Sequence, residues 1–171
     1  ILERGRCVEE RIKDVNLFWR QNRLNPESNI QFGEGGAGTF SDGKLNSLIR
    51  EKDTVGRFVL ETFVKFGAPK EILYKNKPHI GTDILRKIVK NIREYILSKG
   101  AELRFGTLMT GILIRQDAPR PYVYGVTARS AEEEYTLNTD CIFLAIGHSA
   151  RDTFAKLRQQ EIAMERKPFS V

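Results

Sequence analysis

The stretch Gly33-Glu34-Gly35-Gly36-Ala37-Gly38-Thr39-Phe40-Ser41-Asp42-Gly43-Lys44 decides how the rest of the chain is interpreted. Its five glycines exclude a helix or strand interior, because glycine loses much backbone entropy on ordering and offers no side chain for packing. Such a loop exposes backbone N–H groups, and Thr39, Ser41 and Lys44 add hydroxyl donors and a cation, as expected around a phosphate or a polar ring. A flexible linker is the alternative, but the Phe, Asp and Lys residues interleaved with the glycines favour a binding loop.

Composition places the chain among ordinary globular proteins. It has 171 residues, of which 40% are hydrophobic and 29% charged, so it forms one domain or a large part of one. The longest apolar run, Cys141 to Ile146, is too short to cross a membrane, and the residues that follow Ile1 do not resemble a signal peptide. Cys7 and Cys141 are far apart, match no metal or redox spacing and suit a reducing compartment, so we expect a cytoplasmic protein without a membrane partner.

The net charge of +6 raises the question of a nucleic-acid partner. The 28 Lys and Arg residues are spread along the chain and mixed with 22 Asp and Glu residues, without a dense basic block. We therefore expect a solvated basic surface that tolerates anionic ligands, and no nucleic-acid partner.

Hydrophobic periodicity predicts helices at about 8–21, 53–66, 84–99 and 150–160. Trp19 falls at helical spacing and is expected in the core. The buried stripe expected in the second helix is Val55, Phe58, Val59, Thr62, Phe63 and Phe66. The third helix is expected to end at Gly100 and to carry a basic face that is solvated, formed by Arg86, Lys87, Lys90 and Arg93.

Between Gly100 and Asn138 the period changes to two, which predicts a small antiparallel meander with strands near 101–105, 107–115, 122–129 and 135–138. Cys141 to Ile146 is continuously apolar, which is typical of a central parallel strand buried on both faces. Gly147 would turn this strand into the last helix, a geometry that often holds an anion or a cofactor.

Single reactive residues give little support for other chemistry. His79 and His148 have no carboxylate partner at a suitable spacing, so no metal site is expected. For His148 at the strand-to-helix turn, a polar cap contact is favoured over a role as proton donor to a bound cofactor. Ser41 and Ser149 lack a nucleophile-elbow pattern, and no catalytic residue can be named.

Four motifs carry a resemblance to a known family. They are Ile1 to Gly5 (ILERG), Leu24 to Leu45 (LNPESNIQFGEGGAGTFSDGKL), Pro78 to Asp83 (PHIGTD) and Ile142 to Thr153 (IFLAIGHSARDT). In this order they resemble the glutathione-reductase-like flavoproteins, and more closely the functionally uncharacterised FAD-dependent dehydrogenases of bacteria. The resemblance covers essentially the whole chain.

The resemblance implies a role for each matched position. Glu3 would accept the ribose hydroxyls of the adenosine half of FAD, and Arg4 would flank the same nucleotide. Met109 would lend its backbone to the adenine, and Gly147 would be the last glycine of an Ala-Thr-Gly motif in which Ile146 replaces the Thr. The remaining implied contacts run beside the pyrophosphate and isoalloxazine: Gly35, Gly36, Gly38, Thr39, Ser41, Asp42 and Lys44.

The implied fold is α/β: a Rossmann-like, three-layer FAD/NAD(P)-binding domain with an antiparallel β-meander in the crossover. Residues 1–171 would be part of this domain. Residues 1–51 supply the ribose-binding strand end, a helix and the Gly-rich loop, residues 52–100 a helical segment and residues 101–139 the meander. Residues 140–160 supply the buried strand and last helix, and residues 161–171 begin a further segment. The family's Gly-x-Gly-x-x-Gly turn would lie before Ile1, so these residues alone are expected to bind FAD weakly or not at all.

The implied function is an FAD-dependent oxidoreductase, a dehydrogenase in which the flavin carries hydride or electrons. Its small-molecule substrate or electron carrier is unknown, and NAD(P)H is one candidate electron donor. A nucleotide- or RNA-binding α/β module without redox activity is the alternative. Flavin absorption would favour the enzyme, and salt-dependent retention on RNA would favour the module.

Overall fold

The computed structural model describes residues 1–41, 43–45, 55–75, 79–117 and 119–166. The chain divides into two compact units. The N-terminal unit comprises Ile1 and Glu3–Phe105, and the C-terminal unit comprises Leu2 and Gly106–Val171. Together they contain helices and an antiparallel sheet, so the predicted α/β class is confirmed in its coarse form.

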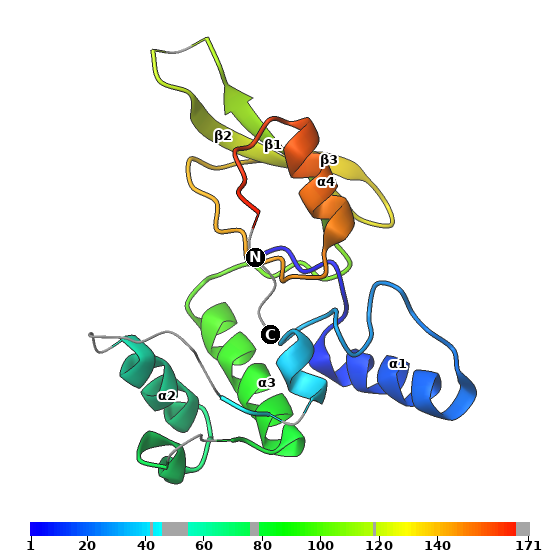
Figure 1. Ribbon diagram of the computed structural model, residues 1–171, viewed down its shortest axis with the longest axis vertical. Coiled ribbons are helices and arrows are strands. Elements are labelled where there is room, and N and C mark those ends of the chain that lie inside the picture. The colour runs from blue at the N-terminus through cyan, green and yellow to red at the C-terminus, as the bar shows by residue number, and fades with distance from the viewer. Residues whose placement is uncertain (42, 46–54, 76–78, 118, 167–171) are drawn as a thin grey trace. The chain divides into compact units, whose positions relative to one another are not determined.

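The described residues of the N-terminal unit form three α-helices and two short 3-10 helices (Figure 1). Its α-helices are α1 (Val8–Gln21), α2 (Val55–Lys65) and α3 (Thr82–Ser98), close to the positions that the periodicity predicts. Its 3-10 helices are η1 (Ala37–Phe40), which lies within the Gly-rich loop, and η2 (Lys70–Leu73).

The core of the N-terminal unit forms around α3. Ile88 is fully buried there, together with Leu85, Ile80, Ile72 and Ala68. Burying one such aliphatic side chain contributes about 1.5–3 kcal/mol, which explains why α3 is the helix on which its neighbours pack. Gly100, which was predicted to end this helix, follows the C-cap residue Lys99. Its φ of 84° is accessible to glycine at little cost.

The predicted apolar stripe of α2 is only partly correct. Phe63 packs against the core, but Phe58 and Val59 are 69% and 43% exposed. The helix carries apolar residues around more than half of its circumference, and α3 covers one face. Trp19, interpreted from its helical spacing as a core residue, is also exposed, at 59%.

The C-terminal unit contains the predicted meander. Strands β1 (Leu108–Arg115), β2 (Tyr122–Arg129) and β3 (Glu134–Asn138) pair antiparallel in the order β1-β2-β3. A register shift between Met109 and Gly111 leaves Thr110 as an extra residue in β1. The expected strand at 101–105 is not formed, and its main-chain bonds are made with the N-terminal residues Ile1 and Glu3 at Arg104.

Helix α4 (Arg151–Gln159) packs on β1 (Figure 1). The side-chain amide of Gln160, which follows α4, donates to the Ile112 carbonyl and accepts from the Ile112 N–H, both at 3.0 Å. The amide thereby takes the place of a strand partner at the outer edge of β1. Gly111 permits this approach, because a Cβ at Gly111 would lie 3.1 Å from the Gln160 nitrogen.

The predicted buried parallel strand at 141–146 is wrong for this structure. The segment belongs to no strand, and Phe143 is 92% exposed. A continuous apolar run is buried as a strand only when neighbouring strands pair with both of its edges and helices cover its faces. Among the described residues, the sheet is the antiparallel meander alone, and none of its strands pairs with this segment.

Candidate functional site

Main-chain contacts hold the C-terminal end of the Gly-rich loop (residues 33–44). Gly43 accepts a hydrogen bond from the Ile80 N–H at 2.9 Å, and Lys44 forms an isolated antiparallel bridge with His79. Gly43 has a φ of 68°, and any Cβ there would collide with the Ile80 carbonyl, so only glycine fits. The loop is therefore joined to the segment that leads into α3, which brings the second and third sequence motifs together.

Arg11 of α1 holds the beginning of the loop. Its side chain is fully buried and donates to the backbone carbonyls of Asn29 (2.7 Å), Ile30 (2.9 Å), Gly33 (3.3 Å) and Glu34 (2.8 Å). Burial lowers the pKa of Arg11 to about 10, against the opposing charges of Glu3 and Glu34, so Arg11 remains protonated at neutral pH. A single guanidinium thus fixes the main chain from Asn29 to Glu34.

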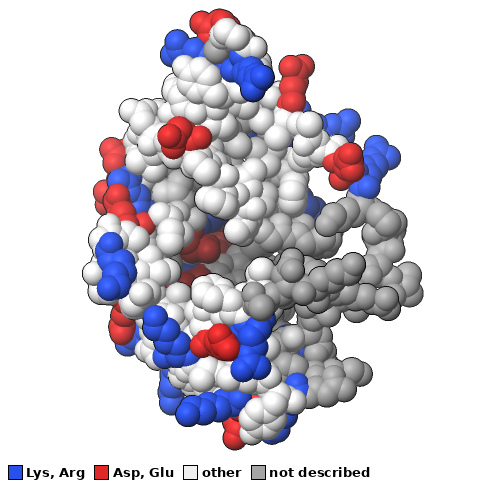
Figure 2. Space-filling model, turned by 90° about the vertical axis from the view of Figure 1, so that its left-hand side faces the viewer, with Lys and Arg blue, Asp and Glu red and all other residues white. Residues whose placement is uncertain are grey.

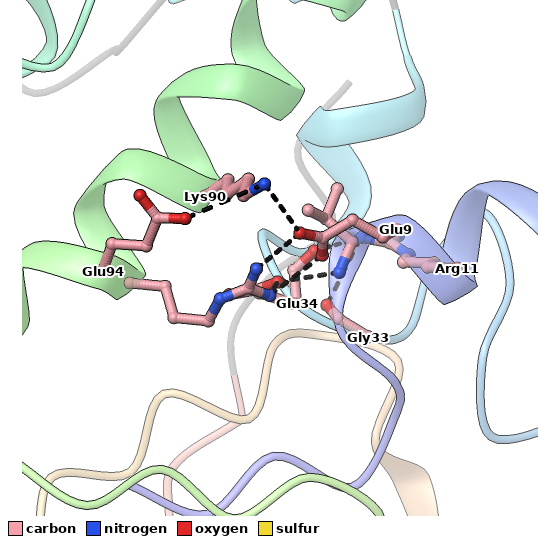
Figure 3. Close-up of polar contacts among 8 residues, drawn as sticks. Glu9, Arg11, Gly33, Glu34, Lys90 and Glu94 are labelled. Carbon is pink, nitrogen blue, oxygen red and sulfur yellow. Dashed lines mark hydrogen bonds and ion pairs between the residues drawn. The ribbon is translucent and has the colours of Figure 1, made fainter. Parts of the chain in front are cut away.

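A carboxylate–arginine cluster of Glu9, Glu34 and Arg93 joins α1, the loop and α3 (Figure 3). Arg93 donates to both oxygens of Glu9, at 2.6 and 3.0 Å, and to Glu34 at 2.7 Å. The same Glu34 oxygen accepts the N–H of Val8, the first residue of α1, at 2.7 Å. A loop carboxylate therefore caps the positive end of α1.

The pKa values of the two carboxylates in this cluster are shifted in opposite directions. The hydrogen bond from Arg93 lowers the pKa of Glu9 to about 2. Burial raises the pKa of Glu34, although the Val8 N–H and the charge of Arg93 oppose the shift. The difference follows from exposure, because the side chain of Glu9 is 43% exposed and that of Glu34 only 10%. Lys90 adds a longer contact of 3.7 Å to Glu9 (Figure 3).

One face of α3 runs along the loop. Arg93 contacts Glu34, and Val89, one turn earlier, lies 3.0 Å from the position of a Cβ on Gly35. Arg86, one further turn back, has its guanidinium carbon 4.5 Å from the ring centre of Phe40 in η1. Because residues 86, 89 and 93 follow helical spacing, one side of α3 supports the loop from Glu34 to Phe40.

The loop tip (Gly35–Gly38) is exposed while its flanks are buried. Within the described part of the chain, the N–H groups of Gly35, Ala37 and Gly38 have no acceptor. A Cβ at Gly36 or Gly38 would meet no atom within 4 Å, so the space beside the main chain is open. Thr39 is fully buried, and its hydroxyl has no partner among the described residues. This arrangement presents unpaired donors to a polar or anionic ligand.

The first motif lies beside the loop. Gly5 packs directly against Gly33, since a Cβ on Gly5 would collide with the Gly33 main chain. Glu3 accepts the Gly5 N–H at 2.7 Å through Oε1, which leaves Oε2 for another donor. Arg4 forms a bidentate pair with Glu27, with 2.8 Å between Nη2 and Oε1, so its guanidinium is engaged within the protein.

The other predicted site residues are Ser41, Asp42, Met109 and Gly147. Ser41 is exposed and donates to the Gly38 carbonyl at 3.3 Å, and Asp42 lies outside the described residues. Met109 and Gly147 belong to the C-terminal unit, so they are not part of the arrangement described for the loop. Gly147 is exposed with a φ of 72°.

Met109 lines a cavity of about 330 Å³ in the C-terminal unit. Its polar wall includes Thr110, the extra residue of β1, which donates to Thr127 at 2.8 Å and to Glu134 at 3.1 Å. Arg129 and residues of α4 complete the lining.

Sequence reasoning missed Arg11, Glu34, Arg86 and Arg93 as residues that build the loop. For Arg11 a signal existed, because it falls between Val8 and Val15 on the apolar face of α1, where a charged residue needs partners. Arg86 and Arg93 were interpreted as parts of a solvated basic face. In the structure, both turn toward the loop.

No group of three or more His, Cys, Asp and Glu side chains within the described ranges could hold a metal ion. None of the described helices is both long and apolar enough to span a membrane.

The chain is similar to a protein of Clostridium beijerinckii that is described as uncharacterized. The two are 43% identical over all 171 residues of this chain. The chain spans 30% of the length of that relative. No protein-family model matches the chain.

Proposed function

We propose that residues 1–171 form part of an FAD-dependent oxidoreductase, with the loop tip lying against the cofactor. The observation that carries this proposal is the set of unpaired N–H groups at Gly35, Ala37 and Gly38, on a loop held by Arg11 and α3. A preorganised main chain binds a polar ligand without the entropic cost of ordering the loop on binding.

The residues present fit such a cofactor in three respects. Glu3 keeps one carboxylate oxygen for a ribose hydroxyl, and the buried Thr39 hydroxyl lacks a partner among the described residues. The open space beside Gly36 and Gly38 would accept a flat ring or a phosphate. When bound, the flavin would supply hydride or electron transfer, and the chain would bind and orient it.

The distribution of charge supports an anionic ligand at the N-terminal unit. Residues 1–105 contain 20 Lys and Arg against 14 Asp and Glu, whereas residues 106–171 contain 8 of each. Figure 2 shows basic and acidic side chains interspersed over the face that it draws. The whole net charge of +6 therefore belongs to the unit that carries the loop, which favours the approach of an anion.

The same charge supports the second candidate, a nucleotide- or RNA-binding module without redox activity. The two functions differ in what they require of the loop tip. A flavin site depends on the open main chain at Gly38, whereas RNA held by surface charge depends on ionic strength.

The test uses the complete natural polypeptide that contains these residues, purified without added cofactor. The proposal predicts visible flavin absorption and its loss in Gly38→Val. Gly38 lies outside the positive-φ region and a Cβ there would meet no atom within 4 Å, so the valine side chain would extend into the open space in which the ligand is proposed to lie. Gly81→Val is the matched control, because Gly81 has the same open surroundings. A colourless protein that binds RNA in a salt-dependent way would favour the module instead.

A further inference from the structure

Phe40 of the loop lies between two guanidinium groups. Arg11 and Arg86 have their guanidinium carbons 4.7 and 4.5 Å from the centre of its ring. Cations near an aromatic face are stabilised by the ring quadrupole, so Phe40 accounts for part of the position of each arginine. The two arginines differ, however, in how their hydrogen-bond donors are used.

Arg11 uses its donors within the protein, on four backbone carbonyls. Arg86 has one ion-pair partner among the described residues, Asp83, at 3.4 Å. The Asp83 side chain is 89% exposed, so solvent weakens this pair. The Arg86 Nε is buried and has no acceptor in the described part of the chain. A guanidinium has five N–H donors, and among the described residues Arg86 has a single side-chain acceptor, Asp83.

A second unmatched donor directly precedes Phe40 in the loop. The Thr39 hydroxyl is buried and without a partner, and it is next to Phe40 in the chain. Buried donors without acceptors are rare in folded proteins and call for a water molecule or an ion. The exposed N–H groups of the loop tip precede Thr39 directly. Arg86, Thr39 and the loop tip thus each offer donors without an acceptor among the described residues. The carboxylate of Glu34, which precedes the tip, is engaged by Arg93 and the Val8 N–H, and Asp83 is exposed beside Arg86.

We propose that Arg86 and the loop tip form a subsite for an oxyanion, either a phosphate of the cofactor or a carboxylate of the substrate. This inference rests on the proposed function for the identity of the ligand, but not for the subsite itself. The planar fork of arginine matches the paired oxygens of both groups, and its stacking on Phe40 holds the fork before the ligand arrives. Arg86 thereby gives α3 a direct role in binding, beyond support of the loop.

The competing explanation is that Arg86 only packs on Phe40. That role would make Arg86 important for stability and irrelevant to anion affinity. The two explanations therefore differ in a property that can be measured on the folded protein.

The experiment is a calorimetric titration of the complete polypeptide with inorganic pyrophosphate, for wild type, Arg86→Ala, Arg86→Lys and Lys87→Ala. Lys87 is the neighbouring exposed cation on α3, so its removal changes the net charge equally. Loss of the charge-assisted hydrogen bonds of Arg86 weakens binding about tenfold to a hundredfold. The affinity of Arg86→Lys for pyrophosphate should lie between those of wild type and Arg86→Ala, because an ammonium keeps the charge but not the planar fork of donors. The affinity of Lys87→Ala should stay near that of wild type. A denaturation curve for each variant confirms that it is folded.

The source of the oxyanion is identified by repeating the titration with acetate and after loading with FAD. Pyrophosphate binding that FAD abolishes assigns the subsite to the cofactor phosphate. Acetate binding that persists with FAD present and depends on Arg86 assigns it to a substrate carboxylate. Either result supports the subsite.

Equal weakening by Arg86→Ala and Lys87→Ala would overturn the subsite, because it would mean that only net charge matters. Unchanged affinity in a folded Arg86→Ala would overturn it as well. Failure of the subsite is distinguishable from failure of the proposed function. A protein that binds FAD with no dependence on Arg86 refutes only the subsite, and Arg86-dependent pyrophosphate binding without any FAD binding refutes only the oxidoreductase.

Discussion

Replacing Arg11 tests how the glycine-rich loop is held. In Arg11→Met the aliphatic packing is largely kept, but the carbonyls of Asn29, Ile30, Gly33 and Glu34 lose their donor. A buried acceptor without a partner costs about 1–3 kcal/mol. Water entering beside the exposed loop tip offsets part of this cost, and so does relief from burying a charge. We expect a net loss of about 3 kcal/mol in the free energy of unfolding, a large part of the total for a domain of this size.

The assay is urea denaturation followed by far-ultraviolet circular dichroism, with hydrogen exchange to report the loop. Arg20→Met is the matched control, because it removes the same charge from an exposed position of α1 and should change stability by less than about 0.5 kcal/mol. Arg11→Lys should lie between the two, since an ammonium cannot reach all four carbonyls. Faster amide exchange at residues 29–34 should accompany the loss. A cost below about 1 kcal/mol in Arg11→Met, with loop exchange unchanged, would refute the role given to Arg11.

Three further predictions concern the cluster, the sheet and the apolar segment. Burial raises the pKa of Glu34, so the folded state holds this proton more tightly than the unfolded state, and stability should fall as pH rises from about 4.5 toward the raised pKa. Glu34→Gln should remove that fall without lowering stability at neutral pH, because its neutral amide avoids the burial of a charge and keeps an oxygen acceptor for the Val8 N–H. Unfolding curves across this range measure it, and an unchanged pH profile would contradict it. Gly111→Ala should destabilise the C-terminal unit by about 1 kcal/mol, because its Cβ would lie 3.1 Å from the Gln160 amide, and a double mutant with Gln160→Ala should lose less than the sum of the single changes. Strictly additive losses in denaturation would argue against the edge contact. Phe143→Ser should change the free energy of unfolding by less than about 0.5 kcal/mol, since Phe143 is 92% exposed, whereas a buried strand residue would cost about 3–5 kcal/mol.

The sequence predicts most of the local structure because local forces decide it. Helix α1 (Val8–Gln21) is predicted to the residue from its periodicity, and the alternation in 107–115 and 122–129 predicts the paired strands β1 and β2. The segment 141–146 shows the limit of this reasoning. Its composition measures a tendency to be buried, but whether a strand forms depends on partners that the composition does not specify.

In the candidate site, too, some residues could be predicted from the sequence and others could not. The glycines, Thr39 and Glu3 stand out by residue type, and the structure brings Glu3–Gly5 beside the beginning of the loop. The arginines that hold the loop do not stand out, because an isolated charge in a helix is usually solvated. The role of Arg93 becomes clear only from the structure, in which it forms ion pairs with both Glu9 and Glu34, two residues far apart in sequence. Long-range charge pairing is a tertiary property, so a single sequence does not reveal it.

The most direct test of the central claim is the visible absorption spectrum of the complete natural polypeptide that contains these residues, purified as wild type, Gly38→Val and Gly81→Val. The loop tip as a flavin site predicts flavin absorption bands in wild type and Gly81→Val, and their loss in a folded Gly38→Val. Flavin retained equally in all three proteins would contradict the placement of the cofactor at this loop. A wild-type protein that is colourless and fails to bind added FAD would contradict the oxidoreductase itself.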